Sequence, residues 1–389
     1  MASEIAPVKL RPPVLDEQDT QSLPNNSQED SRETLHLSNS QAAELVEKLY
    51  GFNVESVRKL GSYGDYNFHV KVFGVGQDHH GYILKVMNAK DSRDEEQITA
   101  QTSMMTFLST RDFQVPRLVQ NRWGQGMSLE TFERKENGTQ VSTDHNVRLL
   151  TFLPGILCSD VTLESASLQA AGVYMGRLHQ ALQDFDHPGL YRPNFKWNLK
   201  NLSGARDYLH VLDSIEDQEM IHNVLGLFAD KVLSRLEDLP QGPTHADFGG
   251  TNILVRESMT NSEGRYQICG VLDFGDVVWN PLVFDVAISL MFYMLTAPDH
   301  EGPATYAGHF VRGYESIRPL TPAEWDVLYH CVVGRACQMY VFNEHSVSVE
   351  PEREAHIRKD TEGLYETLKF LVETPKAEVD KQMLGTGRV

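Results

Sequence analysis

Two short loops, each attached to an apolar strand pattern, carry the polar residues that constrain this chain most. The first loop is rich in glycine and contains Asp247 and, five residues later, Asn252, directly before the apolar run 253–255. The second loop begins with Asp273, 21 positions after Asn252 and directly after the apolar run 268–272. Apolar runs of this kind between turn residues predict two strands. The sequence therefore predicts a hairpin that brings a loop carboxylate, a loop amide and a second carboxylate to one place.

Phosphoryl transfer requires few chemical groups from a protein, because positioning and electrostatic stabilisation supply most of the acceleration. One carboxylate accepts the proton of the attacking hydroxyl, while an amide oxygen and a second carboxylate hold the Mg²⁺ that screens the phosphates. Either loop alone could be an ordinary turn, since Asp, Asn and Gly are common turn residues. The two loops in this order, each with its strand, are much more specific and predict a kinase.

Length and charge limit the other possibilities. A chain of 389 residues favours two or three domains, or one bilobal domain with a large core. Its hydrophobic content of 41% and charged content of 23% are typical of soluble globular proteins. The formal net charge of −19 argues against a nucleic-acid or anionic-membrane partner, because both require basic surfaces. A nucleotide must then be held by a local device such as Mg²⁺ or a well-placed lysine.

The cysteines and the apolar segments indicate a cytoplasmic protein. The cysteines form no Cys-x-x-Cys pair, so we expect free thiols in a reducing compartment; they are Cys158, Cys269, Cys331 and Cys337. The N-terminus has no apolar run that resembles a signal peptide. The most apolar segment, 281–296, is too short to span a membrane and contains Asp285.

Polarity and periodicity divide the chain into four parts. Residues 1–35 are polar and rich in proline, which predicts a disordered tail. Residues 36–153 are expected to form an N-terminal nucleotide-binding lobe, and 154–374 a C-terminal catalytic and substrate lobe. The charged residues 375–389 predict a second tail.

The N-terminal lobe should begin with a helix. Ser38 and Gln41 form a capping-box pattern, and Gly51 is suited to the C-terminal cap. Alternating or apolar runs then predict strands at 54–60, 67–73 and 82–87, a helix at 94–109, an Asn137-Gly138 hairpin and a strand that ends at 147–152. Lys85 lies in the third of these strands among apolar neighbours.

The rest of the chain has helical patterns. They are centred on 168–182, 217–237, 281–296, 303–317, 322–345 and 350–372. His179 lies beside the apolar face of the first of these, and we interpret it as a core or interface residue rather than a metal ligand. The turn that contains Trp197 either faces a ligand or fills the core.

From about residue 35 to 370, the chain resembles the aminoglycoside phosphotransferase and choline kinase-like family. The pattern His245-x-Asp247-x4-Asn252 is similar to the phosphotransferase signature of that family, and Asp273-Phe274-Gly275 is similar to its metal-binding motif. Three further stretches carry the resemblance: 62–70, 148–155 and 197–201. The family implies an α+β, bilobal, protein-kinase-like fold, with an antiparallel sheet and helices in the N-lobe and a larger, mostly helical C-lobe.

The resemblance also implies roles for individual residues. Asp247 would be the catalytic base, Asn252 and Asp273 the Mg²⁺ ligands, and Lys85 the residue that holds the nucleotide phosphates. His245 and Asp285 would support the catalytic loop. Further nucleotide-binding positions are expected in the first turn and before the hinge, at Ser62, Tyr63, Gly64, Asn67, Leu150 and Phe152.

Two positions depart from the family pattern. Position 246 is Ala where many relatives have Gly. The helix residue expected to pair with Lys85 is Gln101 rather than Glu, so the placement of Lys85 would depend on Glu95, on Glu96 or on the nucleotide. This second departure keeps open the alternative of a nucleotide-binding pseudokinase.

The resemblance implies a small-molecule acceptor that carries a hydroxyl and a cationic group. The first candidate reaction transfers the γ-phosphoryl group of GTP to 5-hydroxy-L-lysine. ATP remains open as the donor, and choline, ethanolamine, homoserine and an aminoglycoside remain open as acceptors. Trp197, Asp276 and Glu315 are the candidate substrate residues. A substrate carboxylate would require a donor such as Arg335 or Lys196.

Overall fold

The computed structural model describes residues 35–61, 64–74, 80–136, 139–258, 264–359 and 361–384. All of them belong to one compact unit that begins at Leu35. The tail expected at 1–35 therefore lies outside the described residues except for Leu35, whose side chain is buried. Ser62, Tyr63 and the Asn137-Gly138 hairpin turn also lie outside them.

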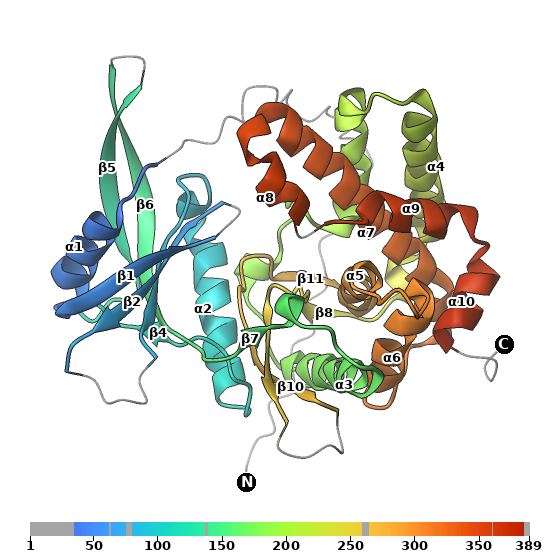
Figure 1. Cartoon of the computed structure of the whole chain (residues 1–389), viewed down its shortest axis with the longest axis horizontal. Helices are drawn as coiled ribbons and strands as arrows, with labels where there is room; N and C mark the ends of the chain where they lie inside the picture. Colours follow the sequence, from blue (N-terminus) through green and yellow to red (C-terminus); the bar gives the residue numbers. More distant parts are fainter. Residues whose placement is uncertain are drawn as a thin grey trace, which may run out of the picture. The chain divides into compact units, whose positions relative to one another are not determined.

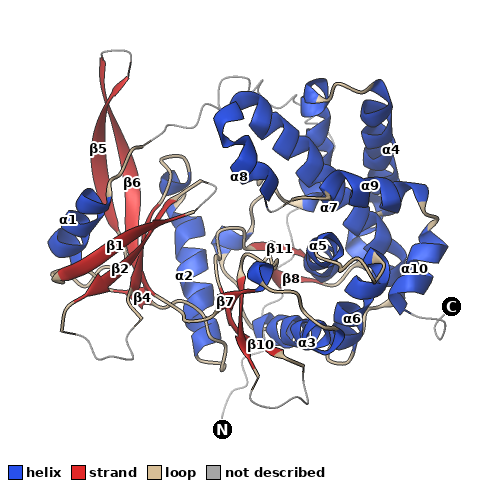
Figure 2. Cartoon of the chain, viewed as in Figure 1, coloured by secondary structure: helices blue, strands red, loops and turns tan. Residues whose placement is uncertain are grey.

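In the described residues, the N-terminal lobe is an antiparallel sheet with two helices (Figures 1 and 2). The strand order is β1-β2-β3-β6-β4, with β5 paired to β6. The elements are α1 (Asn39–Tyr50), β1 (Val54–Leu60), β2 (Tyr66–Val72), β3 (Tyr82–Val86), α2 (Glu95–Ser109), β4 (Leu118–Val119), β5 (Ser128–Glu136) and β6 (Thr139–Thr151). The strands and helices predicted for this part of the chain are confirmed to within a few residues.

Sequence alternation explains how this sheet buries one face. Phe68, Val70 and Val72 of β2 point to the same side, because successive side chains of a strand alternate, and all three are buried. They share a hydrophobic cluster with Val46 and Leu49 of α1. The predicted capping box of Ser38 and Gln41 begins α1, and Gly51 ends it in the left-handed conformation. Both caps are therefore confirmed.

The C-terminal lobe is mostly helical. It contains β7 (Ile156–Leu157), α3 (Ser165–Leu182), a 3₁₀ segment η4 (Leu199–Val211), α4 (Ile215–Lys231), β8 (Gln241–Thr244), β9 (Ile253–Glu257), β10 (Tyr266–Val271), β11 (Val278–Pro281), α5 (Leu282–Leu295), α6 (Pro303–Glu315), α7 (Pro322–Val349), α8 (Glu354–Lys359), α9 (Leu364–Glu373) and α10 (Lys376–Leu384). Strands β9 and β10 pair antiparallel, as the apolar runs beside Asn252 and Asp273 predicted. The α+β bilobal fold is confirmed.

Two predictions for the C-terminal end were wrong. The pattern at 350–372 is not one helix, because a 3₁₀ turn and the left-handed Gly363 separate α8 from α9. The tail expected from residue 375 contains α10 instead. Val379 and Met383 lie one helical turn apart in α10 and are both fully buried, which holds this charged segment on the lobe.

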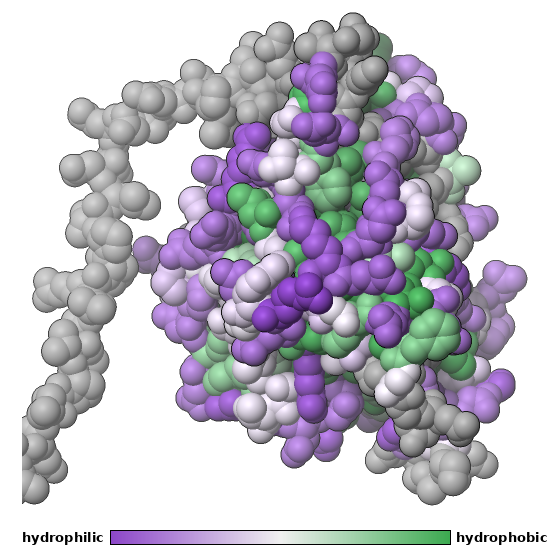
Figure 3. Space-filling view, turned by 90° about the vertical axis from the view of Figure 1, so that its left-hand side faces the viewer, coloured by the Kyte–Doolittle hydropathy of each residue, from purple (hydrophilic) through white to green (hydrophobic). Residues whose placement is uncertain are grey.

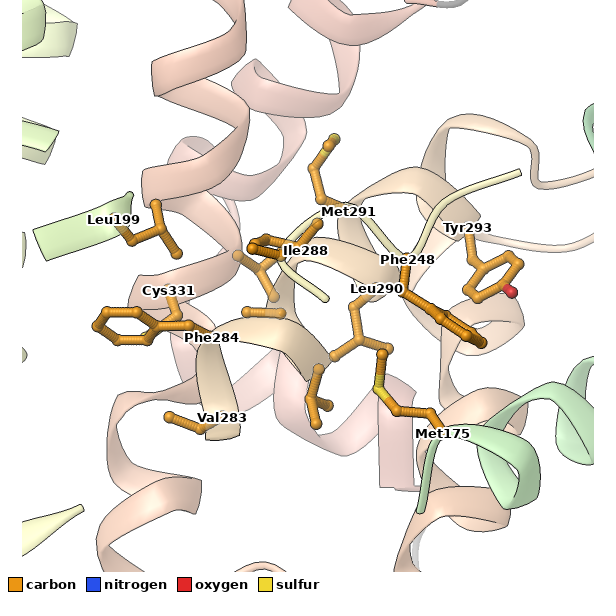
Figure 4. Close-up of a cluster of buried hydrophobic side chains, with 14 of the residues drawn as sticks. Met175, Leu199, Phe248, Val283, Phe284, Ile288, Leu290, Met291, Tyr293 and Cys331 are labelled. Atoms are coloured by element: carbon orange, nitrogen blue, oxygen red, sulfur yellow. The ribbon is translucent and has the colours of Figure 1, made fainter. Parts of the chain in front are cut away.

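Helix α5 forms the centre of the C-lobe core. Most of its side chains are buried, as expected for a helix that is apolar on all sides. Figure 4 shows Phe284 of this helix beside Cys331 of α7, and Leu290 beside Phe248 of the loop that contains Asp247. Burial of Phe248, which directly follows Asp247, anchors the loop that contains Asp247 in this core.

None of the helices in the described part of the chain combines the length and apolarity that a membrane span requires. On the side of the molecule that carries the N-terminal lobe, hydrophilic residues cover most of the described surface (Figure 3).

Candidate active site

Asp285 at the start of α5 binds the backbone of the loop that contains Asp247. Its Oδ2 accepts a hydrogen bond from the His245 nitrogen at 2.9 Å, and its Oδ1 accepts one from the Ala246 nitrogen at 2.8 Å. Ala246 has a φ of 61°, a left-handed conformation that is strained for a residue with a side chain. Gly, which the family resemblance implies at this position, would adopt this conformation without strain. In this chain the two bonds to Asp285 stabilise the strained turn.

The carboxylate of Asp285 is fully buried and has a second partner in the core. His179 Nε2 lies 3.0 Å from its Oδ2, while His179 Nδ1 bonds the Tyr314 hydroxyl at 2.8 Å. Burial alone would raise the pKa of Asp285, but its hydrogen bonds and the nearby histidines hold the pKa below its usual value. His179 is thus a buried, hydrogen-bonded core residue, in agreement with our interpretation of the sequence.

His245 joins the two catalytic loops. Its Nε2 lies 2.9 Å from the Leu272 carbonyl, and its Nδ1 accepts a hydrogen bond from the Asp247 nitrogen at 3.3 Å. Since Nδ1 accepts, the proton must be on Nε2, which donates to Leu272. Both bonds are those expected of a residue that braces the loop.

Asn252 holds the carboxylate of Asp247. Its Nδ2 donates to Asp247 Oδ2 at 2.6 Å and to the Asp247 carbonyl at 3.0 Å. The backbone carbonyl of Asn252 accepts a hydrogen bond from the backbone nitrogen of Leu272 at 2.8 Å, and Leu272 directly precedes Asp273. Burial, as the largest influence, and the nearby Asp273 carboxylate raise the pKa of Asp247, although Arg335 and Asn252 oppose this. The structure therefore brings the three predicted residues together.

Asp273 occupies a strained position at the end of β10. Its φ is 48°, and its Oδ1 accepts hydrogen bonds from the Gly275 nitrogen at 3.0 Å and from Lys85 Nζ at 3.3 Å. The Lys85 ammonium holds the pKa of Asp273 below its usual value. The side chain is 47% exposed, so a carboxylate of low pKa faces solvent at this point.

The donor atoms here fit a hard divalent cation. The bonds from Asn252 engage its amide nitrogen and do not use its side-chain oxygen. Both contacts of Asp273 described above involve Oδ1 rather than Oδ2. Amide and carboxylate oxygens are the ligands that Mg²⁺ prefers, and Mg²⁺ usually keeps several waters beside a few protein ligands. Asn252 and Asp273 therefore suit this ion.

Lys85 is paired with carboxylates that the sequence did not identify as its partners. Its Nζ lies 3.0 Å from Asp65 Oδ2 in the turn before β2. Asp65 Oδ1 also accepts hydrogen bonds from the backbone and side chain of Asn88. Burial would lower the pKa of Lys85, but Asp273 and Asp65 outweigh burial and raise it. Of the alternatives that the sequence left open, Glu95 and Glu96 are exposed to solvent, and the ion pairs of Lys85 are instead with Asp65 and Asp273.

Gln101 belongs to a chain of hydrogen bonds instead. Its Oε1 accepts from Nη2 of the buried Arg148, and its Nε2 donates to Gln97 Oε1. Gln97 Nε2 in turn donates to the Gly275 carbonyl at 2.7 Å, in the loop that begins with Asp273. The residue at the expected glutamate position thus connects the N-lobe sheet to the loop that begins with Asp273 through neutral amides.

Several of the expected nucleotide positions lie on or next to adjacent strands, together with Arg148, which was not expected. Asn67, Lys85 and Arg148 are direct neighbours across β2, β3 and β6, so the three side chains share one face of the sheet. Leu150 is buried on β6, and the Phe152 ring stacks on His69 with the centroids 4.2 Å apart. Gly64 lies at the edge of the described part of its turn.

Two of the three candidate substrate residues lie near Asp247. The Trp197 carbonyl accepts from Arg335, whose Nη2 lies 3.6 Å from Asp247 Oδ1. Burial and the charges of Asp247 and Asp273 raise the pKa of Asp276 to about 7. Glu315 is not part of this group: its Oε1 accepts from the Leu320 nitrogen at 2.6 Å, in the turn between α6 and α7.

Four residues of this site were missed by sequence reasoning. They are Asp65, Gln97, Arg148 and Arg192, and the Arg192 side chain donates to the carbonyls of Gly275 and Val277 at 3.0 and 3.3 Å. A charged residue in an apolar strand was a usable signal for Arg148, as it was for Lys85. The other three act through contacts between segments far apart in sequence.

Comparisons with known proteins show the family to which the chain belongs. Residues 64–320 match the phosphotransferase enzyme family APH. The chain is 33% identical to the hydroxylysine kinase of Danio rerio over 350 residues, which cover 89% of this chain and 95% of the relative. It is also 33% identical to the hydroxylysine kinase of Xenopus laevis, with 89% and 92% covered.

A solved structure described as a microcompartment-associated aminopropanol kinase has the same fold. Its TM-score is 0.61 at 19% identity, and the match covers 86% of this chain and 99% of that one. These comparisons confirm the predicted enzyme class, a phosphotransferase with an alcohol group as acceptor. The chain belongs to the APH phosphotransferase enzyme family.

Proposed function

We propose that this protein transfers the γ-phosphoryl group of GTP to the hydroxyl of 5-hydroxy-L-lysine. The observation that carries the proposal is the pair of hydrogen bonds from Asn252 Nδ2 to Asp247, which fixes the catalytic carboxylate beside the metal-ligand pair. The acceptor follows from the 33% identity to two hydroxylysine kinases, which extends over nearly the whole chain.

Asp247 is the general base of the proposed reaction. The hydroxyl oxygen of the acceptor attacks the γ-phosphorus, its proton passes to the Asp247 carboxylate, and the bond from the γ-phosphorus to the bridging oxygen of GDP breaks. Asn252 orients the Asp247 carboxylate, which keeps a carboxylate oxygen directed at the acceptor hydroxyl during the reaction. His245 and Asp285 keep the loop backbone in place from behind.

Lys85, Asn252 and Asp273 serve the nucleotide. Lys85 moves its hydrogen bonds from Asp65 and Asp273 to phosphate oxygens when the nucleotide enters. Asn252 and Asp273 would hold Mg²⁺, which would supply the positive charge that screens the phosphates. The turn that contains Gly64 covers the phosphates, and the segment from Leu150 to Gly155 contacts the purine.

A nucleoside-diphosphate release assay tests this function. Purified protein with Mg²⁺ should release GDP from GTP in step with phosphorylated 5-hydroxylysine, identified by mass spectrometry. ATP, choline, ethanolamine, homoserine and an aminoglycoside should be assayed side by side. Release of GDP without a phosphorylated acceptor, or a clear preference for another acceptor, would overturn the assignment.

The matched variant is Asp247→Asn, which keeps the shape of the side chain and removes the base. We expect turnover to fall by at least ~10²-fold. Thermal unfolding of the same preparation should remain within a few degrees of the wild type, which separates loss of chemistry from loss of fold. Full activity in this variant contradicts the role of Asp247.

A further inference from the structure

Arg335 on α7 lies beside the catalytic carboxylate, although it belongs to none of the sequence motifs. Its side chain is 3% exposed, and its Nη2 lies 3.6 Å from Asp247 Oδ1. Burial of a guanidinium is costly unless its donors are paired. The hydrogen-bond partners of each Arg335 nitrogen therefore show which of its donors are available to a ligand.

One edge of this guanidinium is fixed by the protein. Nη1 donates to Gln338 Oε1 at 3.0 Å and to the Trp197 carbonyl at 3.4 Å. Gln338 is itself held, because its Nε2 donates to the Lys196 carbonyl at 3.1 Å. The guanidinium carbon lies 5.1 Å from the centroid of the Trp197 ring, within the range of a cation–π contact. The group is thus rigid before any ligand binds.

The opposite edge, formed by Nε and Nη2, is not satisfied. Nε is buried and has no hydrogen-bond partner among the described residues. Nη2 is 3.6 Å from the nearest oxygen of Asp247, which is longer than a hydrogen bond. The two parallel donors of a guanidinium edge match the two oxygens of a carboxylate. The edge that faces the catalytic base therefore has the geometry of a carboxylate-binding fork.

We propose that Arg335 binds the α-carboxylate of the acceptor, an inference that rests on the proposed transfer to a hydroxy amino acid. With the hydroxyl at Asp247 and the carboxylate at Arg335, a short hydroxy amino acid spans the two groups. The surrounding carboxylates of Asp247, Asp273 and Asp276 would otherwise repel an anionic ligand. Choline, ethanolamine and aminoglycosides have no carboxylate, so the fork selects amino acids over amino alcohols.

Lys196 was the other donor that the sequence offered for a substrate carboxylate. Its Nζ lies 4.5 Å from the ring centroid of Phe342 and 4.7 Å from that of Tyr208. These ring contacts, together with the 3.6 Å approach of Arg335 to Asp247, favour Arg335 as the carboxylate ligand.

The test compares 5-hydroxy-L-lysine with its decarboxylated counterpart, 1,5-diaminopentan-2-ol. The wild type should prefer the amino acid by about 10- to 100-fold in kcat/KM, the range expected for charge-assisted hydrogen bonds. In Arg335→Gln this ratio should fall to near one, mainly through a higher KM for 5-hydroxylysine. Arg335→Lys keeps the charge but loses the fork, and its ratio should be intermediate.

Arg318→Gln is the matched control for removal of a mostly buried arginine. Arg318 pairs with the buried Glu324 at 2.9 Å, in the turn between α6 and α7. This variant should lower thermal stability and leave the substrate ratio unchanged. Arg335→Lys provides the ratio if Arg335→Gln does not fold.

Two results would overturn the carboxylate site and leave the proposed function intact. One is a wild type that phosphorylates both acceptors equally well. The other is an Arg335 variant in which both rates fall by the same factor, which would mean that Arg335 acts through Asp247. A wild type that phosphorylates choline or ethanolamine and no hydroxy amino acid would overturn the proposed function and the carboxylate site together.

Discussion

Lys85 is held by Asp65, a residue of the turn above the sheet, with 3.0 Å between Nζ and Oδ2. The Lys85 side chain is 9% exposed and that of Asp65 is 14% exposed, so water screens this pair poorly. The turn is therefore tied to the lysine that the nucleotide phosphates would contact. When the phosphates enter, their oxygens must replace the carboxylate oxygens of Asp65 and Asp273 around the Lys85 ammonium.

Lys85→Met should abolish tight nucleotide binding. The variant removes the ammonium and leaves Asp65 and Asp273 without it, which should weaken binding of Mg²⁺–GTP by about 2–5 kcal/mol. Isothermal titration calorimetry measures this directly. Lys48→Met is the control, since Lys48 is 60% exposed and pairs only at the surface with Glu130, and its binding should equal the wild type. Unchanged affinity in Lys85→Met would contradict the phosphate role.

Asp285→Asn should destabilise the fold in a pH-dependent way. An amide at this position places an N–H donor opposite the backbone nitrogen of Ala246 or His245 and removes the charged partner of His179. We expect the free energy of unfolding to fall by about 3–5 kcal/mol near pH 7. The pKa of Asp285 is lowered in the folded state, so its contribution is present above its unfolded pKa of roughly 3.9. It is lost as the pH falls through the lower, folded pKa.

Denaturant unfolding at several pH values checks this expectation. The difference in unfolding free energy between the wild type and Asp285→Asn should be largest near neutrality and shrink below about pH 4. Asp326→Asn is the control, because Asp326 is 65% exposed and pairs with the partly exposed Arg235. A difference that stays constant down to the lowest pH would show that the charge of Asp285 is not responsible.

Gly172→Ala should disrupt the contact between α3 and α6. A Cβ at Gly172 would overlap the Phe310 carbonyl oxygen and the Tyr314 nitrogen, both backbone atoms that cannot turn aside. We expect a loss of about 1–3 kcal/mol or more in unfolding free energy. Gly226→Ala in α4 meets nothing within 4 Å and should instead stabilise by about 0.5–1 kcal/mol. Equal effects of the two variants in thermal unfolding would refute this packing argument.

Cys269 should be the cysteine most reactive toward iodoacetamide in the folded protein. It is partly exposed, whereas the other three cysteines are buried. Burial raises the pKa of Cys269 and raises that of Cys158 to about 12, so less thiolate forms at neutral pH. Labelling followed by peptide mass spectrometry should be slow at pH 7.5 and faster at pH 9.5. Comparable labelling of Cys158 without denaturant would contradict its burial.

The same cysteine provides a test of nucleotide position. Cys269 Sγ lies 3.8 Å from the Pro154 carbonyl, in the segment between the two lobes. A bound purine near this segment should slow the alkylation of Cys269 and leave that of a denatured sample unchanged.

Local pattern predicted the elements, and long-range contacts decided the details of the site. The strand bearing Lys85 and the helix with the Ser38 cap follow from alternation and capping, which depend on neighbours in sequence. The helix α10 was missed because its charges hide the short apolar stripe of Val379 and Met383. Asp65 and Arg148 were missed because their importance comes from a turn folding over a strand and from the register between β3 and β6.

The amides of Gln101 and Gln97, which link Arg148 to the Gly275 carbonyl, have a consequence for regulation. In a kinase that has a glutamate at the position of Gln101, a change of charge nearby can move the helix and so change the activity. The side chains of Gln97 and Gln101 are neutral, so nearby charge has little effect on their hydrogen bonds, and salt weakens these bonds only slightly. We therefore expect the contact between α2 and the loop that begins with Asp273 to respond little to nearby charge or to salt.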